Sequence, residues 1–174
     1  MEVTLDELLQ SRDLRHQKHL ELLDQFHDHT LVSVTMVMPG TVKSNFISIS
    51  LADKAENFLR HCDKLQIEYL LRLDKHTGSE IFFISKLPLE ETKRLCCAIE
   101  DGHPLGRLWD FDVIKKDSTP MSRTELGVRP RKCIICDEDA IYCIRGRKHS
   151  KEDLYQRVKE IFEQNQYCSD SYEL

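Results

Sequence analysis

Two aspartates separated by one residue, Asp110 and Asp112, have the clearest capacity for chemistry in this sequence. They alternate with Trp109, Phe111 and Val113, and alternation with a period of two is typical of a strand with one buried and one polar face. Both carboxylates then point to one side, with Cα atoms about 6–7 Å apart, so they could share a divalent cation. Mg²⁺ suits such a pair, because it is usually held by one or two carboxylates together with waters and substrate phosphates. The alternative is an exposed acidic strand face.

A compact loop leads into this strand, and its residues His103, Gly106 and Arg107 could face a phosphate. Arg107 would neutralise charge on a leaving group. His103 would serve as a base or as a hydrogen-bond donor to a phosphate. The alternative for His103 is a hydrogen-bonding role within the loop.

Three further cations are candidates for binding phosphate. Arg12 and Arg15 are three residues apart, so they share one helix face. Lys43 lies just before a predicted helix, and a helix N-terminus beside a lysine attracts phosphate. A solvated basic face and an ordinary helix cap with a solvated lysine are the alternatives.

A second constellation consists of Cys133, Cys136, Cys143 and His149. Four soft ligands at this spacing could bind tetrahedral zinc, and reduced, partly buried thiols are the alternative. Basic residues surround them, and we favour binding of a polyphosphate or an acidic protein partner over a solvated basic face. These residues are Arg129, Arg131, Lys132, Arg145, Arg147 and Lys148.

Composition limits the classes of function. A net charge of -5 and a pI near 5.9 argue against a general binder of nucleic acid or anionic membrane. The start of the chain, Met1–Gln10, is acidic and polar, and no apolar run approaches the length of a membrane span. Seven cysteines, an odd number, fit reduced thiols better than a disulfide framework. We therefore expect a cytoplasmic protein.

The order of predicted elements from Leu31 onward is strand, helix, strand, strand, helix, strand. This is the split βαβ, or ferredoxin-like, order, so we predict one α+β domain over 1–174, with a mostly antiparallel sheet and helices on one face. The sheet core is 31–114: strands 31–38, 67–74, 80–85 and 108–114, a loop at 75–79, and helices from 46 to about 64 and 88–100. Before the sheet core we predict a short first helix and a longer one that begins at Ser11. After it we predict a turn-rich stretch over 117–131, a Cys/basic segment at 129–149, a helix at 150–164 and a loose tail from Asn165.

The first and last strands of a split βαβ sheet are antiparallel neighbours. The turn Pro39–Lys43 should then approach Gly106–Asp110. We therefore predict that Lys43 and Arg107 converge on one polyphosphate beside the two carboxylates.

Several segments together resemble the citrate lyase holo-acyl-carrier-protein synthase family, and the resemblance covers nearly the whole chain. The matching segments are Ser11–Arg15, Leu31–Gly40 with Lys43, His103–Val113, and Arg131–Cys136 followed by Cys143 and His149. The strand Trp109–Val113 is also similar to the two-aspartate strand of polymerase-β-like nucleotidyltransferases.

The resemblance implies transfer of the 5″-phosphoribosyl-3′-dephospho-CoA group from 2′-(5″-triphosphoribosyl)-3′-dephospho-CoA to a serine of the citrate lyase acyl carrier (gamma) subunit, with release of pyrophosphate. The nucleophile then belongs to the partner, and Asp110 and Asp112 would hold Mg²⁺. Two alternatives stay open. One is a non-catalytic zinc-containing adaptor that docks the lyase, and the other is the same chemistry on another acyl carrier protein, such as a malonate decarboxylase subunit.

Overall fold

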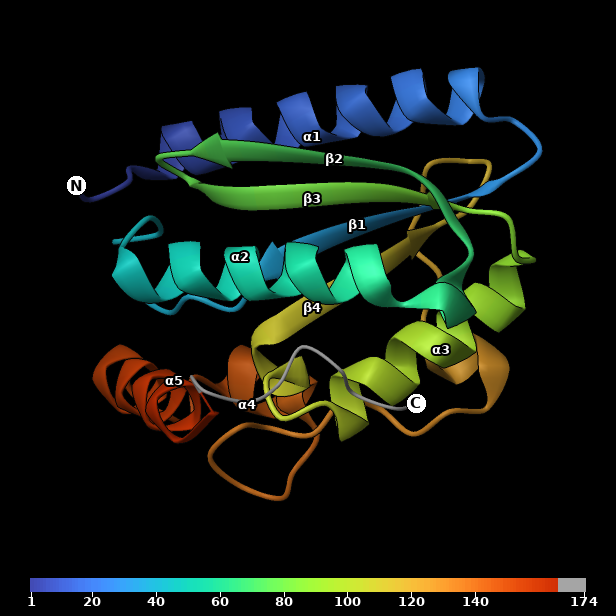
Figure 1. The fold of residues 1–174 in the computed structure, drawn as a ribbon. Coiled ribbons are helices and arrows are strands. Elements are labelled where there is room, and N and C mark those ends of the chain that lie inside the picture. Colours follow the sequence, from blue (N-terminus) through green and yellow to red (C-terminus); the bar gives the residue numbers. More distant parts are fainter. Residues whose placement is uncertain (166–174) are drawn as a thin grey trace.

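A four-stranded antiparallel sheet carries Asp110 and Asp112, and helices cover both of its faces (Figure 1). The computed structural model describes residues 1–165 of the 174-residue chain. The strand order is β2-β3-β1-β4, and each neighbouring pair is antiparallel, which confirms the predicted α+β class. In chain order the elements are α1 (Leu5–Gln25), β1 (Thr30–Met36), α2 (Phe46–His61), β2 (Ile67–Lys75), β3 (Gly78–Ser85), α3 (Leu89–Gly102), β4 (Trp109–Ile114), α4 (Ala140–Gly146) and α5 (Lys151–Asn165).

The connectivity from β1 to β4 is the split βαβ arrangement that the sequence predicts. As expected, β1 and β4 are neighbours although they stand at opposite ends of this unit. Their register pairs Ser33 with Asp112, Thr35 with Asp110 and Met36 with Trp109. The end of β1 therefore lies beside the start of β4, and the residues that follow β1 are brought to the aspartates.

The main core lies between the sheet and helices α2, α3 and α5. Val34 of β1 and Trp109 and Phe111 of β4 are at most 1% exposed and belong to one apolar cluster. The indole Nε1 of Trp109 donates to the Leu51 carbonyl of α2 at 3.1 Å, so its one polar atom is satisfied inside this core. Full burial of such side chains contributes about 2–3 kcal/mol each, which holds β4 firmly in place.

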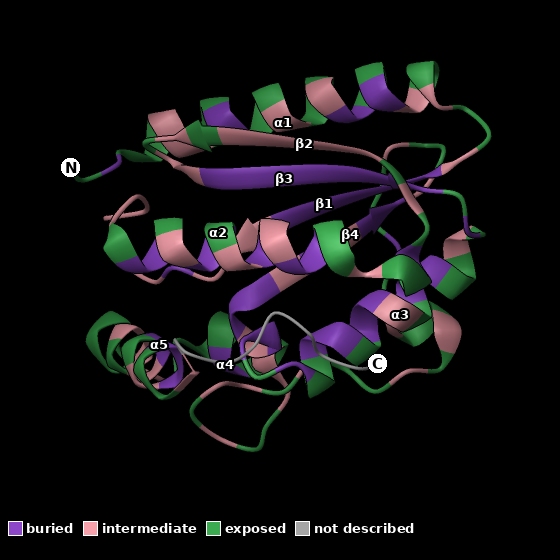
Figure 2. Cartoon of the chain, in the orientation of Figure 1, coloured by how far each residue is buried: buried purple, intermediate pink, exposed green. Residues whose placement is uncertain are grey.

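The helices of the split βαβ unit, α2 and α3, share one face of the sheet as predicted, and α1 covers the opposite face, which was not predicted (Figure 1). Leu22 of α1 contacts a second cluster that includes Leu31, Phe82 and Ile84. The reason is visible in β3, where successive residues are buried rather than alternate ones (Figure 2). A strand that is apolar on both sides needs cover on both faces.

The N-terminal residues form one helix instead of the two that we predicted. Thr4 and Glu7 make the predicted capping box. Ser11, which we took as the start of a second helix, lies within α1, and its buried hydroxyl is 2.9 Å from the Thr77 hydroxyl. The serine therefore serves a tertiary contact and not a helix cap.

The β2–β3 hairpin is also tighter than predicted. Lys75 pairs with Gly78, so the turn is His76–Thr77 and not a five-residue loop. Gly78 has a φ of 113°, a conformation that glycine adopts without steric cost and that allows the short turn.

Side chains of α3 occupy the outer edge of β4. Glu100 accepts a hydrogen bond from the Phe111 N–H at 2.8 Å, and Lys93 donates to the Phe111 carbonyl at 3.2 Å. Both charged side chains are buried, 3% and 5% exposed. They satisfy the backbone groups that an edge strand leaves unpaired.

The C-terminal part of the described chain packs beneath the main core. The predicted helix at 150–164 is confirmed as α5, which buries Val158, Ile161 and Phe162. Helix α4 was not foreseen. The predicted loose tail lies, after Asn165 itself, outside the described residues. Among the helices of residues 1–165, none combines the length and hydropathy that crossing a bilayer requires.

Candidate active site and metal cluster

Asp110 and Asp112 lie on one face of β4, as the alternation predicts, because their neighbours Trp109, Phe111 and Val113 are buried on the other. Asp110 and Asp112 are on the face of the sheet that α1 covers. The row continues across the sheet through Ser33 and Thr35 of β1.

Asp112 is the more enclosed of the two carboxyl groups. Burial first, and the neighbouring Asp110 carboxylate second, raise the pKa of Asp112 to about 6. The hydroxyl of Ser33, its partner in register on β1, is buried and finds no hydrogen-bond partner within residues 1–165. Two carboxyl groups beside an unsatisfied hydroxyl offer oxygen ligands, the kind that a hard divalent cation such as Mg²⁺ prefers.

Asp110 pairs with Arg131, which reaches it from the Cys/basic segment. The Arg131 guanidinium lies 2.9 Å from the Asp110 carboxylate and also donates to the carbonyls of Arg107 and Trp109, each at 2.8 Å. Its side chain is 19% exposed. Arg131 is therefore both a cation at the site and a tether between two parts of the chain.

A cavity of about 670 Å³ opens beside this pair. It lies between the end of β1, the loop before β4 and the Cys/basic segment. Its cationic lining includes Arg12, Lys43, Arg107 and Arg131, and Asp110 lines it as well. The turn after β1 thus reaches the start of β4, and Lys43 shares a cavity with Asp110, as the topology predicts.

Two of these cations are partly desolvated. Burial first, then the charges of Lys151 and Arg12, lower the pKa of Lys43. Burial first, then the adjacent Arg131, lower the pKa of Arg107. Clustered cations with reduced access to water favour an anionic ligand.

Arg15 faces a smaller adjoining cavity of about 180 Å³ that shares Arg12 and Lys43 with the larger one. Its Nε donates to Glu80 at 3.0 Å, and Lys75 contacts the same carboxylate at 2.7 Å. Glu80 is 3% exposed. Arg12, in contrast, is exposed, so it is the freer of the two arginines for a ligand.

His103 and Gly106 have core positions, which differ from the phosphate-facing loop that we expected. The His103 ring is 4% exposed, lies 4.4 Å from the Trp109 ring centroid, and its Nδ1 accepts from the Leu105 N–H at 3.0 Å. His103 therefore has the alternative role, that of a hydrogen-bonding residue within the loop. It packs on Trp109, which faces the main core and not the carboxylates. At Gly106 a Cβ atom would lie 2.1 Å from the Ile99 carbonyl oxygen, so the loop needs glycine for close packing on α3.

Arg145 is exposed on α4 and does not line the large cavity. It therefore lies outside the group of residues that lines the cavity together with Asp110.

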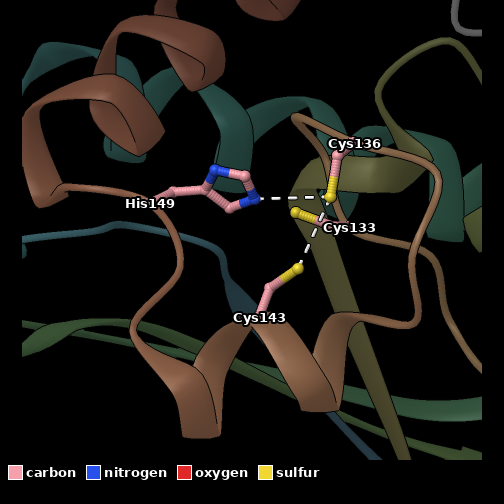
Figure 3. Close-up of side chains that lie close together, drawn as sticks. All are labelled: Cys133, Cys136, Cys143 and His149. Carbon is pink, nitrogen blue, oxygen red and sulfur yellow. Dashed lines mark hydrogen bonds between the residues drawn. The ribbon is translucent and has the colours of Figure 1, made fainter.

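The three cysteines and His149 converge as the spacing suggests (Figure 3). Their ligand atoms all lie within 4.8 Å of one another. The cluster could hold a metal ion, and it borders the large cavity through Cys133, Cys143 and His149.

Sequence reasoning missed Glu80, Lys93 and Glu100, which position Arg15 and β4. The signal was available in part, since a lone Glu80 before the apolar run Ile81–Ile84 marks a charge that must be paired when buried. Lys93 and Glu100 are seven residues apart, which places them on one face of α3.

The fold and the site define a single-domain α+β protein whose sheet carries paired carboxylates next to a cation-lined cavity. The family model described as apo-citrate lyase phosphoribosyl-dephospho-CoA transferase matches residues 3–165. The chain belongs to this family of transferases, as its sequence motifs predict, and it is an enzyme.

Two curated relatives illustrate the similarity, and both are named "Probable apo-citrate lyase phosphoribosyl-dephospho-CoA transferase". The one from Streptococcus pyogenes serotype M18 is 36% identical over 165 residues, covering 91% of this chain and 85% of the relative. The one from Vibrio cholerae serotype O1 is 35% identical over 174 residues, covering 97% of each chain.

Proposed function

We propose that this enzyme transfers the 5″-phosphoribosyl-3′-dephospho-CoA group from 2′-(5″-triphosphoribosyl)-3′-dephospho-CoA to a serine of the citrate lyase acyl carrier subunit and releases pyrophosphate. Family membership supports the class of reaction. The observation that carries the proposal is the large cavity, in which Arg12, Lys43, Arg107 and Arg131 gather beside Asp110. A triphosphate is the part of the donor that such a cavity would bind.

The reaction is attack of an alcohol on the α-phosphorus of a triphosphate, so catalysis is largely positioning and charge neutralisation. Lys43 and Arg107 would bind the β- and γ-phosphates and stabilise the leaving pyrophosphate. Arg12, which lines both cavities and is exposed, would bind the outer phosphate oxygens. The carrier supplies the serine nucleophile, and the open side of the cavity would admit it.

Asp110 and Asp112 would hold Mg²⁺, which would neutralise polyphosphate charge when bound. The buried Ser33 hydroxyl beside Asp112 supports a polar ligand at this place. We assign no proton transfer to His103, since its ring lies within the main core.

The test is to incubate the purified protein with the triphosphoribosyl-dephospho-CoA donor and the apo-carrier. We expect the mass of the carrier to rise by one phosphoribosyl-dephospho-CoA group, with Mg²⁺-dependent release of an equal amount of pyrophosphate. Replacement of the acceptor serine by alanine in the carrier is the control. An unchanged carrier mass with intact, folded protein would refute the proposal. An apo-carrier from malonate decarboxylase, offered in competition, tests acceptor choice.

The second candidate function is a non-catalytic adaptor, which the cysteine and histidine cluster favours. In that case the protein would retain a metal and bind the lyase, but it would leave the carrier unmodified in the same assay.

A further inference from the structure

We propose that Cys133, Cys136, Cys143 and His149 form a closed, tetrahedral zinc site that holds the Cys/basic segment in place. The Cys136 sulfur lies 3.5 Å from the Cys143 sulfur and 3.4 Å from the His149 Nε2. Zinc bonds of about 2.3 Å to sulfur and about 2.0–2.1 Å to nitrogen give tetrahedral edges of about 3.8 Å and 3.5 Å. These two separations are close to the edges of a zinc tetrahedron, and the ligand atoms of all four residues lie within 4.8 Å of one another (Figure 3).

Local backbone structure aims the ligands at one point. The Cys133 N–H donates to the Glu138 carbonyl, and the Ala140 N–H to the Arg131 carbonyl, each at 2.8 Å. These bonds close a loop that turns Cys133 and Cys136 toward α4, as in a paired-cysteine turn. The Ile135 N–H points at the Cys133 sulfur at 3.5 Å, a donor suited to a thiolate.

The other two ligands come from α4 and the turn after it. Cys143 is the inward residue of this helix, between the exposed Tyr142 and Ile144. Arg147 has a φ of 46°, which ends the helix, and the Lys148 N–H donates back to the Cys143 carbonyl at 3.0 Å. This reversal returns the chain so that His149 faces the sulfurs.

The segment has no apolar core that could fix this arrangement. Between Met121 and Val158, all of it described, Cys143 is the one buried residue. Short stretches without a core are usually stabilised by a disulfide or a structural metal. Cys133, Cys136 and Cys143 are free thiols, so a metal is the remaining means of crosslinking them.

The donor set selects the ion. Three thiolates and one imidazole are soft ligands, and tetrahedral coordination by sulfur and nitrogen is typical of zinc. Four protein ligands leave no position for water or substrate, so the site is structural. It is separate from the carboxylates of β4, whose oxygen atoms suit Mg²⁺ instead.

The proposed zinc site also forms part of the wall of the large cavity. Arg131 lies two residues before Cys133, and Cys133, Cys143 and His149 line the cavity that Asp110 also lines. A zinc ion here would fix the wall from which Arg131 reaches β4.

The first test is metal content, measured by elemental analysis of protein purified without chelator from zinc-supplemented cells. We expect about one zinc ion per chain in the wild type and in the control His61→Ala, whose histidine is exposed on α2. His149→Ala and Cys136→Ser should lose most of it, whereas His149→Cys, which restores a ligand, should keep it. A wild type without zinc, or variants that keep it unchanged, would overturn the proposal.

Cobalt replacement covers the case in which a variant does not fold. Wild-type protein stripped of metal and titrated with Co²⁺ should show thiolate charge-transfer bands and the intense visible bands of tetrahedral cobalt, and one equivalent of zinc should abolish them. The absence of these bands refutes the site. Neither test uses donor or carrier, so a negative result here leaves the proposed transfer to its own assay.

Hydrogen exchange tests the structural role. After zinc removal, amides of residues 133–149 should lose protection by at least about tenfold, while those of β1 and β3 keep theirs. Equal protection with and without zinc would contradict the proposal.

Discussion

The Arg131 guanidinium lies 2.9 Å from the Asp110 carboxylate, so the Cys/basic segment is bound directly to β4 at the candidate active site. Asp112, two residues further along the strand, is held differently. Burial first and the nearness of Asp110 second raise its pKa to about 6. Two aspartates on one strand face therefore have distinct environments, and replacing each should have distinct effects.

We expect Asp110→Asn and Asp112→Asn each to abolish transfer, because each removes one of the two carboxylates proposed to hold Mg²⁺. Asp110→Asn should also lower the free energy of unfolding by about 1 kcal/mol, since it weakens a partly exposed pair with Arg131. Asp112→Asn should cost little at neutral pH, because the amide avoids burying a charge. Carrier mass and denaturant unfolding provide the measurements. Near-normal, Mg²⁺-dependent modification of the carrier by either variant would contradict the assignment.

Lys43→Ala should weaken donor binding or turnover about tenfold or more, because it removes a partly desolvated cation from the cavity. Its stability should stay within about 0.5 kcal/mol of the wild type. Lys86→Ala is the matched control, since Lys86 is exposed and follows β3 at the opposite end of its pairing with β1. Steady-state kinetics with varied donor measures the effect. If both variants behave alike, Lys43 has no part in donor binding.

Gly106→Ala should destabilise the protein by about 2 kcal/mol or more, because its Cβ would lie 2.1 Å from the Ile99 carbonyl oxygen, an atom of the α3 backbone. Gly146→Ala is the control at a site where a Cβ meets nothing within 4 Å. That change should be neutral or stabilise by up to about 1 kcal/mol. Thermal or urea unfolding compares them, and equal stabilities would show that the loop before β4 can shift away from α3.

The contribution of His19 to stability should fall in mild acid, opposite in sign to that of Asp112, whose raised pKa favours the folded state below about pH 6. Burial first, then Arg15 and His16, lower its pKa from 6.5 to about 4, and its buried Nε2 has no hydrogen-bond partner within residues 1–165. Between these pH values the unfolded chain binds the His19 proton and the folded chain does not, so the contribution of His19 to stability rises with pH across this window. The contribution is at most about 3 kcal/mol, present above pH 6.5 and lost as the pH falls toward 4.

His19→Leu should reduce the rise of stability with pH in this window, and His61→Gln, at an exposed position, should leave the pH dependence unchanged. Unfolding free energies measured at several pH values in that window decide between them. A slope that persists in His19→Leu belongs to other groups.

The sheet could be predicted from the sequence because its signals are short-range. The alternation of apolar and acidic residues around Asp110 predicted which residues lie on each face of β4. The order of elements predicted that β1 pairs with β4 and that Lys43 approaches the start of β4. The second layer could not be predicted in this way. Both faces of β3 are buried, and only the three-dimensional packing of α1 shows what covers the second one.

The positions of His103 and Gly106 in the loop could not be predicted for a similar reason, whereas Arg107 of the same loop does line the cavity. His103 and Gly106 stand next to Arg107 in the sequence, but the first is packed on Trp109 and the second on α3. Residue type and spacing do not distinguish a phosphate-facing histidine from one that satisfies its own loop. The partners of buried charges, such as Glu80 with Arg15, are 65 residues apart and follow from the fold alone.

The side chains of Lys93 and Glu100 on the outer edge of β4 have a consequence for how the enzyme recognises a protein. With the Phe111 N–H and carbonyl already bonded, this edge cannot accept an extra strand from another chain at that point. An acceptor that added a strand beside Phe111 of β4 would first have to break both bonds. Binding of an acceptor by addition of a strand is therefore disfavoured at the β4 edge, and the same two bonds protect this edge from edge-to-edge self-association.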